Sequence, residues 1–366
     1  MKVAIVIDAF TRGGAQIAML ELAREFKKRS HHVDLILMMN SRLEIVDVQD
    51  SFIGIYRVNA MHLFDIKGLF RFFRILRREN YEVVIANLYF SQLWCGLIKW
   101  FARNMRLVWV EHNVYHNRSA FQWWLVRYFG RRFDEFVAVS AEVRDFLRVR
   151  AGLDSIVIPN AIHDRIERVR VPHEGLNVLF VGRLIEQKRP NLALSSFEEA
   201  FRRGSISNES MLSFVGEGPL EISLRKQSRD LGIEHRVKFL GYRVPETMGE
   251  IYASHHCLLT TSIVEGQPLN RLEALHQGLC VVTTETPGLA EILSMIVKID
   301  RSNGVFVVRP DVNEIAEALR QAQEVSCWSE EKISKRKHLV RNCLPNQVGD
   351  RYEELILELE SKGKTR

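Results

Sequence analysis

Short apolar runs alternate with longer amphipathic stretches along the whole chain. Runs rich in Val, Ile and Leu that end at turn residues are typical of buried β-strands. We predict strands at residues 3–7, 33–38, 83–86, 107–110, 136–139 and 156–158, and again at 177–181, 212–215, 237–240, 258–261 and 280–283. Helical patterns fill most intervals between them. The alternation predicts an α/β fold in which crossover helices join the strands of parallel sheets.

A polar stretch without an apolar period, at residues 164–175, separates the two strand series. The chain has 366 residues, whereas one domain usually has ~150. We therefore predict two doubly wound, Rossmann-like domains, over 1–168 and 169–345, and a C-terminal helix over 346–366. Because ligands of such sheets bind at the carboxyl ends of the strands, we expect the site in a cleft there.

Composition narrows the class of protein. The chain is 46% hydrophobic and 26% charged, as soluble globular proteins are. Five scattered cysteines with no Cys-x-x-Cys pair argue against a disulfide framework or a zinc site and favour a reducing, cytoplasmic location. The longest uncharged run, at 83–98, is shorter than the ~20 apolar residues of a spanning helix, so we expect no membrane span.

The positive charge is concentrated in one segment. The net charge is +6, and residues 67–132 contain 12 basic and 3 acidic residues. Aromatic residues are interleaved with these cations: Phe70, Phe72, Phe73, Trp123, Trp124 and Phe129. The pattern suits a helix that lies on an anionic membrane surface, or a core-facing helix with a solvated basic face. Nucleic acid is not an expected partner, because no nucleic-acid-binding motif accompanies the charge.

Three predicted loops combine glycines or cations with a strand end. Gly13 and Gly14 lie between a strand and a helix, where backbone amides can approach a phosphate; a tight turn is the alternative. Arg183 and Lys188 follow the strand at 177–181 and could clamp a diphosphate, if they are not simply solvated surface charges. Gly216 opens a Gly-Glu-Gly-Pro turn that needs no ligand by itself.

A fourth loop offers two carboxylates. Its helix should begin near Pro268 and end at Gly278, which places Glu265 ahead of the helix and Glu273 inside it. The two acids could hold sugar hydroxyls. The first amides of the helix, those of Leu269 and Asn270, could receive a phosphate, because a helix N-terminus is positive. Alternatively, the negative charge of Glu265 stabilises the positive N-terminus of the helix, and Glu273 is an exposed helix residue.

Taken together, these loops resemble glycosyltransferase family 4, the retaining enzymes with GT-B architecture. The resemblance covers nearly the whole chain. Its strongest part is the Glu-x7-Glu motif from Glu265 to Glu273. Further matching pieces, in family order, are Gly13-Gly14, residues 138–140 and 158–160, Gly182-Arg183 with Lys188, residues 216–219 and 239–241, Gly278, and Gly288 with Glu291.

The resemblance implies a function and a set of site residues. The chain would transfer a sugar, with retention, from a nucleotide-diphosphate sugar to a hydroxyl of a growing glycan or lipid-linked acceptor, in cell-surface polysaccharide or glycolipid synthesis. The first domain would bind the acceptor and the second the donor, and the C-terminal helix would return to the first domain. The implied catalytic residues are Glu265, His112, Arg183 and Lys188, and the implied donor-binding residues are Gly13, Gly14, Arg183, Lys188, Gly216, Pro268, Leu269, Asn270 and Glu273. Neither a metal nor a cofactor is expected, and the sequence has no Asp-x-Asp.

Several departures from the family pattern bear on loop conformation. Gln16 replaces a frequent Glu, Arg189 and Ala161 replace frequent glycines, and Pro287 replaces one of two glycines before Glu291.

Four alternative functions remain. Two are enzymes of other kinds: an inverting or epimerising enzyme on the same architecture, and a nicotinamide dehydrogenase, which would need a glycine fingerprint that is absent. The others are a non-catalytic glycan- or membrane-binding scaffold and an enzyme with a soluble acceptor.

Overall fold

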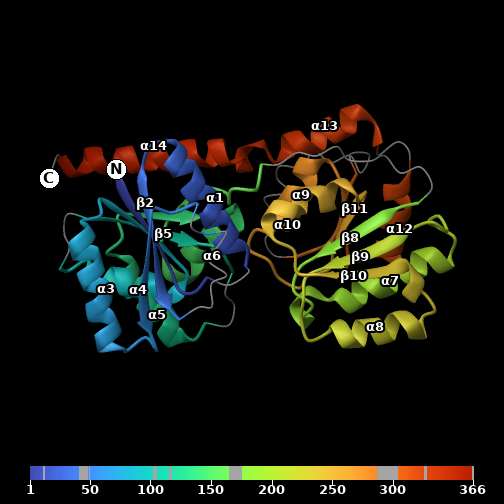
Figure 1. Cartoon of the computed structure of the whole chain (residues 1–366), viewed down its shortest axis with the longest axis horizontal. Coiled ribbons are helices and arrows are strands. Elements are labelled where there is room, and N and C mark those ends of the chain that lie inside the picture. Colours follow the sequence, from blue (N-terminus) through green and yellow to red (C-terminus); the bar gives the residue numbers. More distant parts are fainter. Residues whose placement is uncertain are drawn as a thin grey trace. The chain divides into compact units, whose positions relative to one another are not determined.

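The computed structural model describes residues 1–10, 13–40, 48, 50–101, 105–114, 118–164, 175–286, 304–324 and 328–364. The chain divides into two compact units (Figure 1). Unit 1 comprises residues 1–162 and 343–366, and unit 2 comprises residues 163–342. Each unit is built on one parallel sheet with flanking helices, so the predicted α/β fold with two Rossmann-like domains is confirmed.

Unit 1 contains a seven-stranded sheet in its described part, with the order β3-β2-β1-β4-β5-β6-β7. Its strands are β1 (Lys2–Ile7), β2 (His32–Met39), β3 (Gly54–Ala60), β4 (Val83–Asn87), β5 (Arg106–Glu111), β6 (Glu135–Ala138) and β7 (Ile156–Val157). The direction of winding reverses between β1 and β4, which pair in parallel. The loops that follow these two strands therefore open at the same edge of the sheet.

Helices cover both faces of this sheet. They are α1 (Gly14–Lys28), α3 (Ile66–Glu79), α4 (Tyr89–Ile98), α5 (Ala120–Gly130), α6 (Ala141–Ala151) and α14 (Pro345–Lys364). Alternate strand residues such as Ala4 and Val6 pack with apolar residues of α3, α4 and α5 in one core. Side chains start several of these helices: Asp65 caps α3 and Ser119 forms a capping box with Gln122 at α5.

The C-terminal helix α14 packs against the last turn of α1 (Figure 1). Arg29, at the end of α1, contacts Asp350 at 2.8 Å and Glu353 at 2.6 Å, and Phe26 meets Tyr352 edge-on. These contacts explain why the last residues belong to unit 1 although they follow unit 2 in the sequence.

The units divide slightly before the predicted domain limits. The predicted limit at 168/169 lies outside the described residues, and the change of unit comes after Ile162. The Ile162 amide donates to the Cys343 carbonyl at 2.9 Å. This bond joins the residue at which the chain leaves unit 1 to the residue at which it returns. Asp164, two residues later, pairs with His276 of unit 2 at 3.0 Å. The return to unit 1, at Cys343, likewise precedes the predicted limit at 345.

Unit 2 contains a six-stranded parallel sheet in its described part, with the order β10-β9-β8-β11-β12-β13. Its strands are β8 (Asn177–Val181), β9 (Met211–Val215), β10 (Val237–Gly241), β11 (Cys257–Thr260), β12 (Cys280–Thr284) and β13 (Val305–Val308). Here the winding reverses between the paired strands β8 and β11. The loop with Arg183 and Lys188 and the loop with Glu265 follow these two strands, so the topology brings them together.

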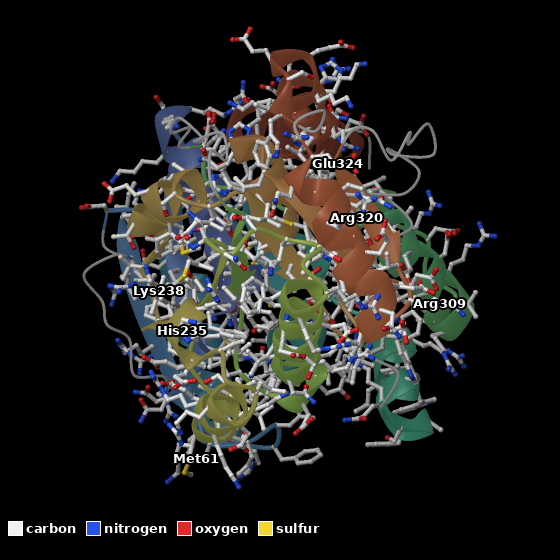
Figure 2. All side chains as sticks on the ribbon, turned by 90° about the vertical axis from the view of Figure 1, so that its right-hand side faces the viewer. Met61, His235, Lys238, Arg309, Arg320 and Glu324 are labelled. Atoms are coloured by element: carbon white, nitrogen blue, oxygen red, sulfur yellow. The ribbon has the colours of Figure 1, made fainter. Side chains whose placement is uncertain are left out.

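The helices of unit 2 include the one that carries the Glu-x7-Glu motif. Its helical elements are η1 (Glu186–Lys188), α7 (Pro190–Arg202), α8 (Glu221–Asp230), η2 (Glu234–Arg236), α9 (Pro245–Ala253), α10 (Leu269–Gln277), α12 (Val312–Gln323) and α13 (Glu330–Leu339). Helices α7, α8 and α12 contribute to one core. The outer face of α12 is charged, and Arg320 bonds Glu324 there at 2.8 Å (Figure 2). Across the described ranges of both units, no helix combines the length and apolar character needed to cross a membrane.

Candidate active site

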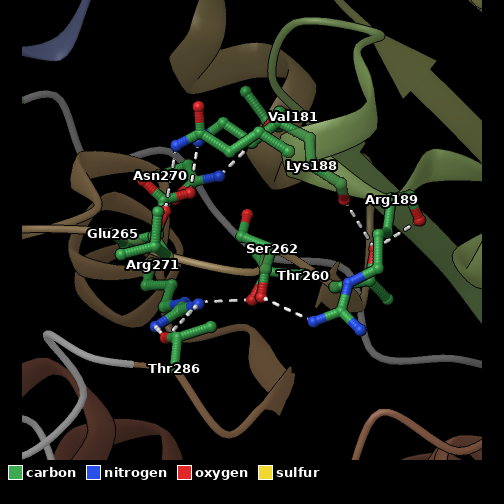
Figure 3. A network of polar contacts seen from close by, with 12 residues as sticks. Val181, Lys188, Arg189, Thr260, Ser262, Glu265, Asn270, Arg271 and Thr286 are labelled. Atoms are coloured by element: carbon green, nitrogen blue, oxygen red, sulfur yellow. Dashed lines mark hydrogen bonds and ion pairs between the residues drawn. The ribbon is translucent and has the colours of Figure 1, made fainter. Parts of the chain in front are cut away.

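Two loops at the carboxyl edge of the unit 2 sheet hold each other. Hydrogen bonds in both directions join the loop after β8, residues 182–189, to the loop after β11, residues 261–268 (Figure 3). The Ile263 amide donates to the Gln187 carbonyl at 2.8 Å, and the Gln187 side chain donates to the Val264 carbonyl at 3.2 Å. These contacts fix the loops as one surface.

Lys188 and Glu265 form an ion pair across these two loops (Figure 3). Their side chains are 18% and 13% exposed, so both charges are largely removed from water. The sequence assigned them separately, to a diphosphate and to a sugar, and the structure places them in contact. An arriving diphosphate would compete with Glu265 for the Lys188 ammonium.

Arg183 supplies a second cation at the end of β8. It is exposed, and its guanidinium has no polar partner among the residues that the structure describes. Its position one residue beyond Gly182 and in the same loop as Lys188 agrees with the predicted pair of cations. Arg183 is therefore able to meet a ligand without first giving up an ion pair.

Gly216 and Gly218 pack against the Arg183 loop. A Cβ atom on Gly216, whose φ is 129°, would lie 2.0 Å from the Gly182 carbonyl oxygen. A Cβ on Gly218 would lie 2.3 Å from the Leu184 carbonyl oxygen. The close approach of two main chains therefore explains both glycines without any ligand. A donor-binding role of Gly216 stays a prediction.

Helix α10 begins beside these loops, and its predicted limits are confirmed. Pro268 precedes the first residue, Leu269, and Gly278 ends the helix at φ 89°. The Asn270 side chain donates to the Val181 carbonyl at 2.7 Å, which ties the helix start to the end of β8 (Figure 3). The first amides of any helix lack intrahelical acceptors, so they are available to an anion at this edge.

Glu273 points to a tyrosine of the neighbouring helix. The Tyr252 hydroxyl, from α9, donates to Glu273 Oε2 at 2.8 Å. Burial and the nearby carboxylate raise the pKa of Tyr252 well above its usual value, so it stays a proton donor. Glu273 is half-buried, so the alternative of an exposed helix residue is wrong. Tyr252 thus holds the carboxylate in one orientation.

Arg271 is a buried cation that the sequence analysis did not single out. Its side chain is 1% exposed and donates from Nε to Thr260 Oγ1 at 2.9 Å and from both terminal nitrogens to Thr286 Oγ1 at 3.3 Å (Figure 3). Burial lowers the pKa of Arg271 to about 10, and the charge of Glu265 counteracts this. The available signal was weak: Ala274 and Leu275, three and four residues further along α10, lie on the same side as Arg271 and are apolar.

Arg189 explains one departure from the family pattern. Its φ is 46°, in the left-handed region where glycine is the favoured residue. Its guanidinium donates to the Ser262 carbonyl at 3.4 Å (Figure 3). The backbone here therefore keeps the conformation that glycine would give, and the arginine side chain adds a contact to the Glu265 loop.

In unit 1, His112 follows β5 and is 4% exposed. Its Nε2 lies 3.0 Å from Asn87 Oδ1, and its Nδ1 lies 3.1 Å from Asn160 Oδ1. Burial lowers the pKa of His112 to about 4, so the ring is neutral at pH 7. The Asn87 amide nitrogen is directed to the Ile85 carbonyl at 3.2 Å, which leaves Oδ1 to accept from Nε2–H. A neutral ring carries a single N–H, so the second nitrogen, Nδ1, is then an acceptor that faces the Asn160 amide.

Gly13 and Gly14 begin α1 in unit 1. Gly13 is the N-cap with φ −118°, and residues 11–12 just before it lie outside the described residues. Gln16, which replaces the family Glu, is buried and donates to the Ala9 carbonyl at 3.0 Å.

Two other matching residues, Gly288 and Glu291, also lie outside the described residues. Within the described ranges, no group of three or more His, Cys, Asp or Glu side chains could hold a metal ion.

Comparison with known proteins identifies the family. Residues 12–165 match the family described as Glycosyltransferase Family 4, and residues 163–341 match Glycosyl transferases group 1. The two matches together cover both units. The chain belongs to these glycosyltransferases and has their GT-B fold.

Curated relatives are similar over part of their length. One is a component of the phosphatidylinositol N-acetylglucosaminyltransferase of Arabidopsis thaliana, which is 25% identical over 264 residues, 68% of this chain and 56% of the relative. Alpha-monoglucosyldiacylglycerol synthase of Streptococcus pneumoniae is 23% identical over 260 residues, which are 63% of this chain and 58% of the relative. The chain thus spans little more than half the length of these relatives.

Solved structures share the fold over nearly the whole chain. The crystal structure of HepE from Anabaena in complex with UDP has a TM-score of 0.80 and 16% identity, and it covers 98% of this chain and 100% of HepE. HepE has also been solved with UDP-glucose. At this identity, the likeness establishes the architecture.

Proposed function

We propose that the chain transfers a sugar from a nucleoside-diphosphate sugar to a hydroxyl of a lipid-linked or membrane-proximal acceptor, with retention at the anomeric carbon. The observation that carries the proposal is the meeting of Lys188 and Glu265 at the start of α10, beside Arg183. This arrangement combines cations for a diphosphate with a carboxylate for sugar hydroxyls.

The donor's diphosphate is the proposed ligand of the cations. Arg183 and Lys188 would bind its oxygens, and the first amides of α10 would share the charge that builds up as it departs. Glu273, held by Tyr252, would take the ribose hydroxyls. Fixed cations already supply this charge, so the proposed reaction requires no metal. Because HepE has been solved with UDP and with UDP-glucose, a UDP-sugar is the first donor to test.

The transfer itself exchanges one bond for another. The bond between the anomeric carbon and the diphosphate oxygen breaks, and the acceptor oxygen bonds the same face of that carbon. The acceptor's proton passes to the departing diphosphate, so the products are the glycosylated acceptor and a nucleoside diphosphate. Glu265 would orient the sugar, and the resemblance to the family implies a role for the neutral ring of His112 at the reacting sugar as well.

The proposed acceptor and location have separate support. Both curated relatives are named for lipid glycosylation: one is named as an N-acetylglucosaminyltransferase of phosphatidylinositol, and the other as the synthase of a monoglucosyldiacylglycerol. Cys95, Cys257, Cys280 and Cys343 are free thiols, which is the usual state in the cytoplasm. We infer an enzyme that works at the inner face of the cell membrane in cell-surface polysaccharide or glycolipid synthesis.

The direct test is a panel of nucleoside-diphosphate sugars with the purified chain in the presence of a chelator. We expect slow donor hydrolysis with one of them, and transfer once lipid extracts are added, with the donor's anomeric configuration kept in the NMR spectrum of the product. Inversion, a strict Mn²⁺ or Mg²⁺ requirement, or no turnover of any donor would reject the corresponding part of the proposal.

A further inference from the structure

Unit 1 exposes large apolar side chains on three neighbouring elements. They come from the turn before α3 and its first two turns, from the end of α4, and from α5. The residues are Met61, Phe64, Ile66, Phe70, Trp100, Phe101, Phe121, Trp124 and Tyr128. A monomeric protein rarely leaves so many together in water, so the cluster calls for a partner.

The turn before α3 is held firmly although its side chains face water. Asp65 accepts from the amides of Met61 at 3.2 Å and of Gly68 at 2.9 Å. Met61, Phe64 and Ile66 are nevertheless 78%, 77% and 81% exposed. The Met61 side chain projects away from the ribbon (Figure 2). The backbone thus presents these apolar side chains in a fixed arrangement.

Ring contacts join the three elements into one surface. Phe73 of α3 meets Phe101 at 6.0 Å between ring centroids. Next to Phe101, the Trp100 ring lies 4.6 Å from the Arg132 guanidinium, which also lies 4.3 Å from the Tyr128 ring. Along α5 the rings stack further, from Tyr128 to Trp124 at 5.4 Å and from Trp124 to Phe121 at 6.0 Å.

Cations border this surface, and three acids near them are already engaged. The exposed basic residues are Lys67, Arg71, Arg74, Arg77, Arg78, Arg127 and Arg131. Asp65 caps α3, Glu79 pairs with Lys2 at 2.7 Å, and Asp134 pairs with Lys99 at 2.7 Å. The surface therefore combines exposed aromatic rings with unbalanced positive charge.

This arrangement refines the expected role of residues 67–132. Phe72 and Trp123 are buried core residues, and Phe73 and Phe129 are half-buried, so they are not available to a partner. Of the aromatics expected there, Phe70 and Trp124 are exposed. Residues 61–66, outside the expected range, supply the most exposed apolar side chains of this surface.

We propose that this aromatic–basic surface docks on an anionic phospholipid bilayer, with the apolar side chains among the headgroups and the cations at the lipid phosphates. The occupant follows from charge complementarity together with exposed rings, which suit an interface that is apolar on one side and anionic on the other. The inference deepens the proposed function, on whose lipid acceptor it rests, but docking needs no sugar donor.

Tryptophan fluorescence can report this contact directly. The chain has six tryptophans. Trp100 and Trp124 are exposed and lie in the surface, whereas Trp94, Trp109, Trp123 and Trp328 are buried. Vesicles that contain brominated phosphatidylglycerol should therefore quench part of the emission, and brominated phosphatidylcholine vesicles should not. Flotation with the same unbrominated vesicles measures the affinity.

Two sets of substitutions separate the apolar and the charged contributions. We expect Phe64→Ser with Ile66→Ser, and Lys67→Gln with Arg74→Gln and Arg77→Gln, each to weaken binding to anionic vesicles at least tenfold. Arg71 is left in place because its guanidinium donates to the Val58 and Asn59 carbonyls. The matched control on α8 of unit 2 is Ile222→Ser with Lys226→Gln and Arg229→Gln, which should bind as the unchanged chain does.

The outcomes distinguish docking from catalysis. No flotation with anionic vesicles at low salt, an equal loss in the α8 control, or unchanged binding of both surface variants overturns the docking proposal. Donor hydrolysis without lipid tests the chemistry separately, and the surface variants should retain it. Hydrolysis without vesicle binding would reject docking alone, and vesicle binding without any donor turnover would reject the proposed chemistry.

Discussion

At the scale of single residues, the contact between Lys188 and Glu265 governs how a diphosphate enters the site. Arg183→Ala removes an exposed cation, so we expect UDP affinity to fall by ~1.5–3 kcal/mol, or about ten- to a hundredfold. Lys188→Ala should cost more, because it also leaves Glu265 unpaired beside the phosphates. Adding Glu265→Gln to Lys188→Ala should restore part of the affinity. Calorimetry measures this series, with Lys226→Ala as a control, and unchanged affinity in both single variants contradicts the diphosphate assignment.

The two acids of the motif should differ in their effects. Glu265→Gln should abolish transfer while the chain stays folded and still binds nucleotide, because the variant frees Lys188. Glu273→Gln should mainly weaken nucleotide binding, and Tyr252→Phe should do so less, since it removes only the hydroxyl that orients Glu273. Steady-state kinetics and calorimetry separate these effects. Wild-type turnover in both acid variants would make the motif structural here.

At the scale of elements, strand pattern predicted nearly all of each sheet, and the misses share a cause. Strands β3 and β13 were not predicted. β3 is an edge strand in which Tyr56, Arg57 and Asn59 interrupt the apolar run, and β13 is a short edge strand with two half-buried residues. An edge strand needs burial on fewer sides, so its sequence carries a weaker signal. The limits of α10 were predictable because proline and glycine mark them.

The site was predictable only where backbone chemistry or a family motif marked it. Gly-rich turns and acids at strand ends pointed to the two loops, but nothing local in the sequence pairs Lys188 with Glu265 or buries Arg271 beside Thr260. Such contacts depend on the order of strands in the sheet, which puts β8 next to β11.

The loop after β8 gives an element-scale prediction about backbone strain. Arg189 has φ 46°, so Arg189→Gly should be more stable than Arg189→Ala by ~1 kcal/mol, because the left-handed conformation penalises a Cβ. The exposed helical residue Lys226 is the control, where Gly should instead be less stable than Ala by ~0.5–1 kcal/mol. Urea unfolding measures both pairs. The same order of Gly and Ala at the two positions would refute the strain.

At the scale of the whole molecule, the chain leaves unit 1 at Ile162 and returns to it at Cys343, so unit 1 is closed by contacts between its two ends. Arg29 is central to that closure: besides Asp350 and Glu353, it donates to the Asn346 carbonyl at 2.9 Å. Its side chain is largely buried against α14, so these charged hydrogen bonds are better shielded from water than ordinary surface pairs.

We expect Arg29→Ala to destabilise unit 1 by roughly 2–3 kcal/mol, because several hydrogen bonds to charged groups are lost together and Glu353 keeps only its 3.5 Å contact with His31. Five of the six tryptophans lie in unit 1 and only Trp328 lies in unit 2, so tryptophan emission during urea unfolding reports mainly on unit 1. The neighbouring Lys28→Ala, an exposed residue with one contact to Glu25 at 3.3 Å, should cost less than ~1 kcal/mol. UDP affinity, which the proposed function assigns chiefly to the unit 2 loops, should stay unchanged in both variants. Equal unfolding midpoints for the two variants would show that the return of α14 does not depend on Arg29.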